Sequence, residues 1–586
     1  MILHALTTAL AAALVASPQE GPGPAQGGAA PGASSEDSIH LLSMSCGDLA
    51  TTLQHPKDAG LARALRMLDE RLAEIPSEFE GDVPPMLVAA LEPAAIPVWL
   101  RLLQAPKSVR VDVSRSAIGS YRLPFQVGFA LHEESPEAAQ RLEAGVRALA
   151  ERMRMRLPDG MVAVEDRSIL LRTGRTPEPM GGTRAAEMAG DGGGALLAEM
   201  RMDLGGYLEF MEALVMQSGA PLEVGIAFDV LDRIGLMDCT LEVATASDAS
   251  ASRTVALVTE LGGRMRDAGL LPAEGLAAAH LAPVPADATW MSVERFDMAA
   301  AFRALNGLVS ELMQQAGGGG DAAEMLASIT GFDLEDGLFG ALGDTYGVYA
   351  SHSTGGGGLT STVLFVSLRD AEALLETKEG IEELLNGQAA LHARGYVSAR
   401  TWTHGDGEYT TLTFPGLPVP MEPTIALTEE WLVVAATPQA ALGAMAQIES
   451  GDAGIAAHPG IAPLLTGGAK NAITYFDTEH YARRGYGATS LLMSGVSNAM
   501  RSRVDATRDP GPLLPTFGVF VEGIRPTIGH GEVHGENYVS VSVGDASNAV
   551  QCAAFAGILQ DYAPLLALPL LAAGGNEIFD EIGRGF

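Results

Sequence analysis

Residues 289–309, TWMSVERFDMAAAFRALNGLV, contain the pattern that decides the fold of this chain. Apolar side chains alternate before Asp297, as a half-buried strand requires, and after it the apolar spacing becomes helical. An aspartate at such a junction accepts a hydrogen bond from a free N–H of the first helical turn and complements the helix dipole. The stretch therefore predicts a strand that leads directly into a helix capped by Asp297.

The same pattern occurs four times along the chain. The other three stretches are IHLLSMSCGDLATTL at 39–53, LLAEMRMDLGGYLEFMEALV at 196–215 and AITYFDTEHYARRGY at 472–486, with Asp48, Asp203 and Asp477 at the junctions. These aspartates could instead be metal-binding or catalytic carboxylates, but helix capping explains all four positions and is the favoured interpretation.

Two further patterns recur between these stretches. A strand followed by an amphipathic helix is expected at 125–153 and again at 361–385, and a two-stranded hairpin at 161–174 and again at 424–437. The same order of parts occurs twice, which indicates an internal duplication. We therefore expect an α+β fold with two tandem, internally duplicated domains of antiparallel sheet, each with helices packed on one face.

The predicted boundaries follow the composition of the chain. We expect a signal peptide at 1–17, a flexible Pro/Gly/Ala linker at 18–37, a first α+β domain at 38–282 and a second at 283–586 that repeats the first. The apolar run at 2–16 has the length of a signal-peptide core and is too short to span a bilayer. The alternative is an apolar helix of a cytosolic protein, since no Lys or Arg precedes Lys57. We expect export to the periplasm or the extracellular space.

The C-terminal apolar segment 553–573 contains Gln560, Asp561, Pro564 and Pro569. A charge in mid-span is costly in a bilayer, so we expect no integral membrane span after removal of the signal peptide. The segment is instead predicted to be a buried or surface-packed terminal helix that its prolines interrupt.

The composition excludes several classes of function. The 586 residues include 37 Lys and Arg against 72 Asp and Glu, a net charge of −35, which argues against nucleic-acid partners. With 47% hydrophobic and 19% charged residues, the chain as a whole is not disordered. The three cysteines, Cys46, Cys239 and Cys552, are too few and too far apart for a disulfide framework or a Cys-rich metal site.

Sequence motifs of catalysis are absent: there is no HExxH, no P-loop, no GxSxG and no EF-hand loop. The densest set of metal-ligand side chains is in GHGEVHGENY, where four of them alternate onto one face of an extended strand. These candidate metal ligands are His530, Glu532, His534 and Glu536. Such a pattern is more often the solvent-exposed face of a hairpin, and no other cofactor and no catalytic residue is predicted.

Four segments of the second half carry a resemblance to a known protein family. They are LAPVPADATWMSVERFDMAAAF, ITGFDLEDGLFGALGDTYGVYAS, STVLFVSLRDAEAL and PTIALTEEWLVVAATPQAALGAM. Over roughly residues 280–450 the chain resembles a family of exported bacterial proteins, the domain of unknown function 3352. The resemblance implies an extracytoplasmic location and a tandem α+β architecture, and it implies no activity.

These observations predict an exported acidic protein that is more a binding or envelope-associated structural module than an enzyme. A protein or small-ligand partner is expected in a cleft between the two domains, because duplicated domains often enclose one. The alternatives are an extracytoplasmic hydrolase, with the His530–Glu536 cluster as its metal site, and an inhibitor or chaperone of a secreted partner.

Overall fold

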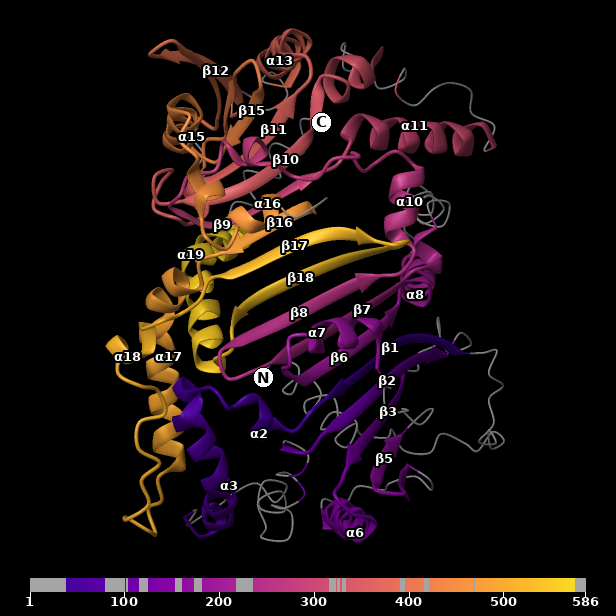
Figure 1. Ribbon diagram of the computed structural model, residues 1–586, viewed down its shortest axis with the longest axis vertical. Helices are drawn as coiled ribbons and strands as arrows, with labels where there is room; N and C mark the ends of the chain where they lie inside the picture. Colours follow the sequence, from indigo (N-terminus) through magenta and orange to yellow (C-terminus); the bar gives the residue numbers. More distant parts are fainter. Residues whose placement is uncertain are drawn as a thin grey trace. The chain divides into compact units, whose positions relative to one another are not determined.

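The computed structural model in Figure 1 describes residues 38–78, 98, 101, 104–114, 125–152, 161–172, 182–217, 235–315, 323, 327–328, 333–389, 396–415, 421–466 and 470–574. The predicted signal peptide and linker lie outside the described residues. The chain forms two compact units, described here one at a time. Unit 1 consists of 1–259, 486–524 and 543–553, and unit 2 of 260–485, 525–542 and 554–586.

Unit 1 is built on an antiparallel sheet with the strand order β4–β5–β3–β2–β1–β6–β7–β8. The strands are β1 (Ser38–Cys46), β2 (Lys107–Ser114), β3 (Phe125–His132), β4 (Val162–Glu165), β5 (Ser168–Arg172), β6 (Ala195–Asp203), β7 (Thr240–Ser247) and β8 (Ala251–Val258). The helices are α2 (Leu49–Thr52), α3 (Ala59–Glu78), α6 (Pro136–Arg152), α7 (Arg184–Gly190), α8 (Leu204–Gln217) and α18 (Phe517–Val521), with short 3-10 turns at Pro56–Asp58 and Leu236–Asp238.

Unit 2 contains an antiparallel sheet with the strand order β12–β13–β14–β15–β11–β10–β9–β16–β17. The strands are β9 (Ala288–Arg295), β10 (Leu342–Ser351), β11 (Thr362–Leu368), β12 (Ser398–His404), β13 (Gly407–Thr413), β14 (Thr424–Leu427), β15 (Trp431–Ala435), β16 (Lys470–Phe476) and β17 (Thr527–His534). The helices are α10 (Leu261–Asp267), α11 (Met298–Gln315), α13 (Ala371–Leu384), α15 (Pro438–Ser450) and α16 (Ala462–Thr466), with π-helical turns at Leu334–Phe339 and Leu385–Ala389 and 3-10 turns at Ala278–Leu281, Leu359–Ser361 and Gly454–Ala457.

Three elements contribute residues to both units. They are α17 (Thr478–Met500), β18 (Asn537–Asp545) and α19 (Asn548–Gly574). The structure therefore divides the chain differently from the expected boundary at 282/283, because the chain returns to unit 1 through α17 and β18. The helix α19 continues through Pro564 and Pro569, where the sequence predicted an interruption. None of the helices in the described part of the chain combines the length and the apolar character that a bilayer span requires.

The predicted antiparallel α+β fold is confirmed, but in unit 2 helices pack on both faces of the sheet. On one face, Phe365 and Trp431 pack edge to face at 5.5 Å in a core that includes Ala444 of α15. On the other face, Leu374 of α13 packs with Val366 of β11. Adjacent strand residues point to opposite faces, so a strand that is apolar on both sides requires a cover on each.

The order of paired strands is the same in the two units once the β12–β13 hairpin is set aside. In this correspondence β1, β2, β3, β4, β5, β6 and β7 match β9, β10, β11, β14, β15, β16 and β17. The correspondence agrees with the order of parts expected from the sequence. Descent of both units from one ancestral domain stays a prediction.

The four junction aspartates all cap the helices that follow them, as predicted. Their Oδ1 atoms accept from the backbone N–H groups of Ala50 (2.6 Å from Asp48), Gly206 (3.1 Å from Asp203), Ala300 (2.8 Å from Asp297) and His480 (2.9 Å from Asp477). At each junction the aspartate therefore satisfies one of the free N–H groups at the start of the helix.

Candidate functional site

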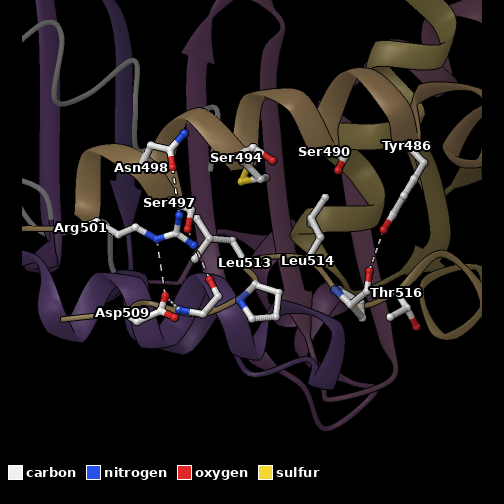
Figure 2. Close-up of a pocket in the computed structure, with 14 residues that line it drawn as sticks. Tyr486, Ser490, Ser494, Ser497, Asn498, Arg501, Asp509, Leu513, Leu514 and Thr516 are labelled. Carbon is white, nitrogen blue, oxygen red and sulfur yellow. Dashed lines mark hydrogen bonds and ion pairs between the residues drawn. The ribbon is translucent and has the colours of Figure 1, made fainter. Parts of the chain in front are cut away.

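A groove in unit 1 has the volume of a ligand site. It lies between the part of α17 that belongs to unit 1 and the segment 509–516, and its volume is about 590 Å³ (Figure 2). One wall is a row of side chains spaced by about one helical turn, which puts them on one face of α17. These side chains are Ser490, Ser494, Ser497 and Asn498.

The opposite wall is formed by the segment DPGPLLPT at 509–516. Its three prolines fix φ and lack an N–H, so the segment crosses beside the helix without joining a sheet, and it turns at Gly511, where φ is +64°. Leu513 and Leu514 point toward α17, and with Met493 they form a floor that is at most 8% exposed. The groove thus combines an apolar floor with hydroxyl and amide groups on its wall.

Polar contacts hold both ends of the groove. At one end, the Arg501 guanidinium lies 3.7 Å from an Asp509 carboxylate oxygen and donates to the Asn498 amide oxygen at 3.2 Å. At the other end, the Tyr486 hydroxyl donates to the Pro515 carbonyl at 2.9 Å (Figure 2). Asp509 balances the charge of Arg501, so these two residues together add no net charge to the groove.

The helix α3 braces the chain that leaves α17. Arg71 Nε donates to the Ala499 carbonyl at 2.6 Å, and Glu78 accepts from the Arg503 N–H at 2.8 Å. The hydrogen bond from Arg71 is the main reason why the pKa of Glu78 falls to about 2, so this carboxylate stays ionised. Arg508 adds an ion pair to Glu74 at 2.8 Å. These contacts fix the segment 501–508 and hence the position of the far wall.

A second set of hollows in unit 1 surrounds Arg101. Three cavities of about 620, 420 and 470 Å³ are all lined by this residue. Its guanidinium is already bound by both oxygens of Glu133, at 3.0 and 2.6 Å, and this hydrogen bonding raises the pKa of Arg101. Residues 99–100 and 102–103 lie outside the described residues, so the α17 groove is the more complete candidate.

The four predicted metal ligands lie on or beside β17, but the structure gives each acid another neighbour. The carboxylate of Glu532 pairs with Lys470 of β16, and Glu536, 72% exposed, lies 3.6 Å from Arg266. His530 Nε2 is 3.9 Å from Glu532, and His534 is exposed. Among the described residues, no group of three or more His, Cys, Asp or Glu side chains is placed to hold a metal ion.

The groove is not predictable from the sequence, although part of its pattern is local. Ser490, Ser494 and Ser497 show helical spacing, but such a row is also the ordinary solvent face of a helix. This face of α17 becomes the wall of a groove because segment 509–516 crosses beside it. The sequence of α17 does not predict that crossing. No protein-family model, curated protein or solved structure matches this chain.

Proposed function

We propose that this protein is an exported binding module that holds a neutral, polar small ligand in the α17 groove. The volume of about 590 Å³ falls in the usual range for ligand sites, which is roughly 300–1,000 Å³. The observation that carries the proposal is the pairing of an apolar floor with a row of hydroxyl and amide groups. Such a wall can donate and accept hydrogen bonds but offers no uncompensated charge.

The charge of the chain supports a neutral ligand. A net charge of −35 repels small anions from the surface as a whole. Among the described residues that line the groove, the one carboxylate that could attract a cation is Asp509, and it already faces Arg501 at 3.7 Å. The expected ligands are therefore polyols, sugars or short peptides whose termini are blocked.

The experiment is a thermal-shift screen of the full-length mature protein against neutral oligosaccharides, blocked di- and tripeptides, fatty acids and divalent metals. We expect one of the two neutral polar classes to raise Tm, because a ligand that binds only the folded state stabilises it. Calorimetric titration of the hit then gives its Kd.

Two variants locate the site. Ser494→Trp places a large ring in the groove from an exposed helix position and should abolish the shift. Leu491→Trp, at a position of the same helix that is 77% exposed and does not line the groove, should leave it unchanged. A shift that survives Ser494→Trp, or the absence of a shift with every neutral polar compound, would reject the groove as the ligand site.

Export is the second part of the proposal, and it rests on residues 1–37. Intact-mass analysis of the protein from its native host should show a chain that begins near residue 17 or 18. A full-length chain that retains 1–17 in the cytosolic fraction would contradict it.

A further inference from the structure

Three side chains of unit 1 form a hydrogen-bonded series on one face of the sheet. Ser43 Oγ lies 3.2 Å from His40 Nε2, and His40 Nδ1 lies 2.9 Å from Asp112 Oδ1. His40 and Asp112 are directly opposite each other on β1 and β2. This is the connectivity of a nucleophile, a base and the carboxylate that orients the base.

A bulge in β1 brings His40 and Ser43 to the same face. In a regular strand, residues three positions apart point to opposite faces. The register between β1 and β2 shifts between His40 and Leu42, and the extra residue restores Ser43 to the face of His40. The register also places Ser43 opposite Arg110, on the same face as Asp112.

The hydrogen bonds select one tautomer of His40. An ionised carboxylate only accepts hydrogen bonds, so Nδ1 carries the proton that bonds to Asp112. In the neutral ring Nε2 is then a free acceptor that faces the hydroxyl of Ser43. This is the protonation state in which an imidazole removes a proton from a serine.

Asp112 is held ionised although it is only 1% exposed. Burial alone would raise its pKa, but hydrogen bonds from His40 and Arg110 outweigh burial and lower the pKa below its usual value. Arg110 Nε lies 3.1 and 2.8 Å from the two carboxylate oxygens. The carboxylate is therefore fixed in position, as an orienting group must be.

The outer end of the series is open and lies beside a cation. The side chain of His40 is 28% exposed, and Ser43 is partly exposed. Arg201 of β6 is directly opposite Ser43 in the register and is exposed. Opposite residues share a face of the sheet, with Cβ atoms roughly 5 Å apart. A guanidinium at this place can stabilise negative charge that develops next to Ser43.

We propose that Ser43, His40 and Asp112 form a site that hydrolyses carboxylic esters through an acyl-serine intermediate. This activity goes beyond the proposed binding function and uses none of the residues of the groove. Esters that carry a negative group near the reacting carbonyl are the favoured class, because Arg201 can pair with that group.

The proposed reaction has two balanced halves. The Ser43 hydroxyl gives its proton to His40 Nε2, and its oxygen lone pair forms the bond to the ester carbon while the carbonyl pair moves to oxygen. Collapse of this adduct breaks the ester C–O bond, and the leaving alkoxide takes the proton from Nε2. Water then repeats the sequence on the acyl-serine and releases the acid. Asp112 stays ionised throughout and stabilises the imidazolium.

The test uses a fluorophosphonate probe and two chromogenic esters, 4-nitrophenyl acetate and the 4-nitrophenyl monoester of succinic acid. We expect one equivalent of phosphonate on the full-length protein and ester hydrolysis above the buffer rate. Ser43→Ala should abolish labelling and lower the rate about 100-fold or more, and His40→Gln should act similarly. Arg201→Gln should raise KM for the succinate ester more than for the acetate.

Ser45→Ala is the matched control, because Ser45 lies on the same face two residues away and donates to Glu199 at 3.4 Å rather than to an imidazole. It should keep both labelling and hydrolysis. Circular dichroism and Tm must show that Ser43→Ala is folded, which is expected for the loss of one partly exposed hydroxyl. Labelling that is equal in Ser43→Ala, or no labelling of the folded wild type, would overturn the proposal.

Discussion

The Asp58 carboxylate accepts a hydrogen bond from the Ser547 hydroxyl at 2.8 Å, although the two residues are 489 positions apart in the sequence. Asp58 also accepts from the backbone N–H groups of Asn548 and Ala549, both at 2.8 Å. It is completely buried, and its oxygens satisfy the first free N–H groups of α19. A residue near the start of the described chain thus caps its last helix.

This cap should be one of the more sensitive positions for stability. Asp58→Ala removes the acceptor of two buried donors, the Ser547 hydroxyl and the Ala549 N–H, and of the half-buried Asn548 N–H. We expect a loss of about 3 kcal/mol in the free energy of unfolding. Urea denaturation of the purified variant measures the loss. Asp509→Ala, at a carboxylate 64% exposed, is the control and should cost less than about 0.5 kcal/mol. A midpoint for Asp58→Ala equal to that of the wild type would show that the cap is not formed.

The strand–helix junctions offer a smaller and more local test. Asp477→Ala removes the acceptor for the His480 N–H and should cost about 1 kcal/mol. Asp477→Asn keeps a side-chain oxygen at the same place and should recover most of that loss. Equal destabilisation by both variants would mean that the charge, rather than the hydrogen bond, stabilises α17.

The capped junctions were predictable because each depends on a few neighbouring residues. The series Ser43–His40–Asp112 was not, since it requires the pairing of β1 with β2, 72 positions away, and a bulge that no motif marks. The β17 cluster shows the reverse case. The alternation of its His and Glu side chains was visible in the sequence. The residue that pairs with Glu532, however, is Lys470, which lies on another strand. Contacts between distant segments set what these side chains do.

That partner leads to a prediction about metals. Because Lys470 neutralises Glu532 and Arg266 faces Glu536, we expect less than stoichiometric zinc or manganese in the purified protein. Added EDTA should leave Tm unchanged in the wild type, and it should likewise leave the Tm of the His530→Ala variant unchanged. Elemental analysis gives the direct answer. If the protein holds one equivalent of metal and loses it in His530→Ala and His534→Ala, the hypothesis of a metal-dependent hydrolase would be favoured again.

The buried Lys107 makes stability depend on pH. Burial lowers its pKa from 10.5 to about 8, and the side chain is only 1% exposed. The unfolded chain therefore binds more protons than the folded chain between pH 8 and 10.5, and stability from this group rises with pH over that window. The nearby Cys46 thiol has the opposite effect on stability. Burial raises its pKa from 9.0 to about 11, so its contribution to stability falls as the pH rises above 9.

Below pH 9 the effect of Lys107 can be measured by itself, because the Cys46 thiol is still mostly protonated in both the folded and the unfolded state. Urea denaturation at pH 7, 8 and 9 should show the wild type gaining stability, whereas Lys107→Met should gain less. Cys46→Ala keeps the lysine and should retain the rise up to pH 9. A wild type that gains no more stability than Lys107→Met between pH 7 and 9 would mean that burial does not lower the pKa of Lys107.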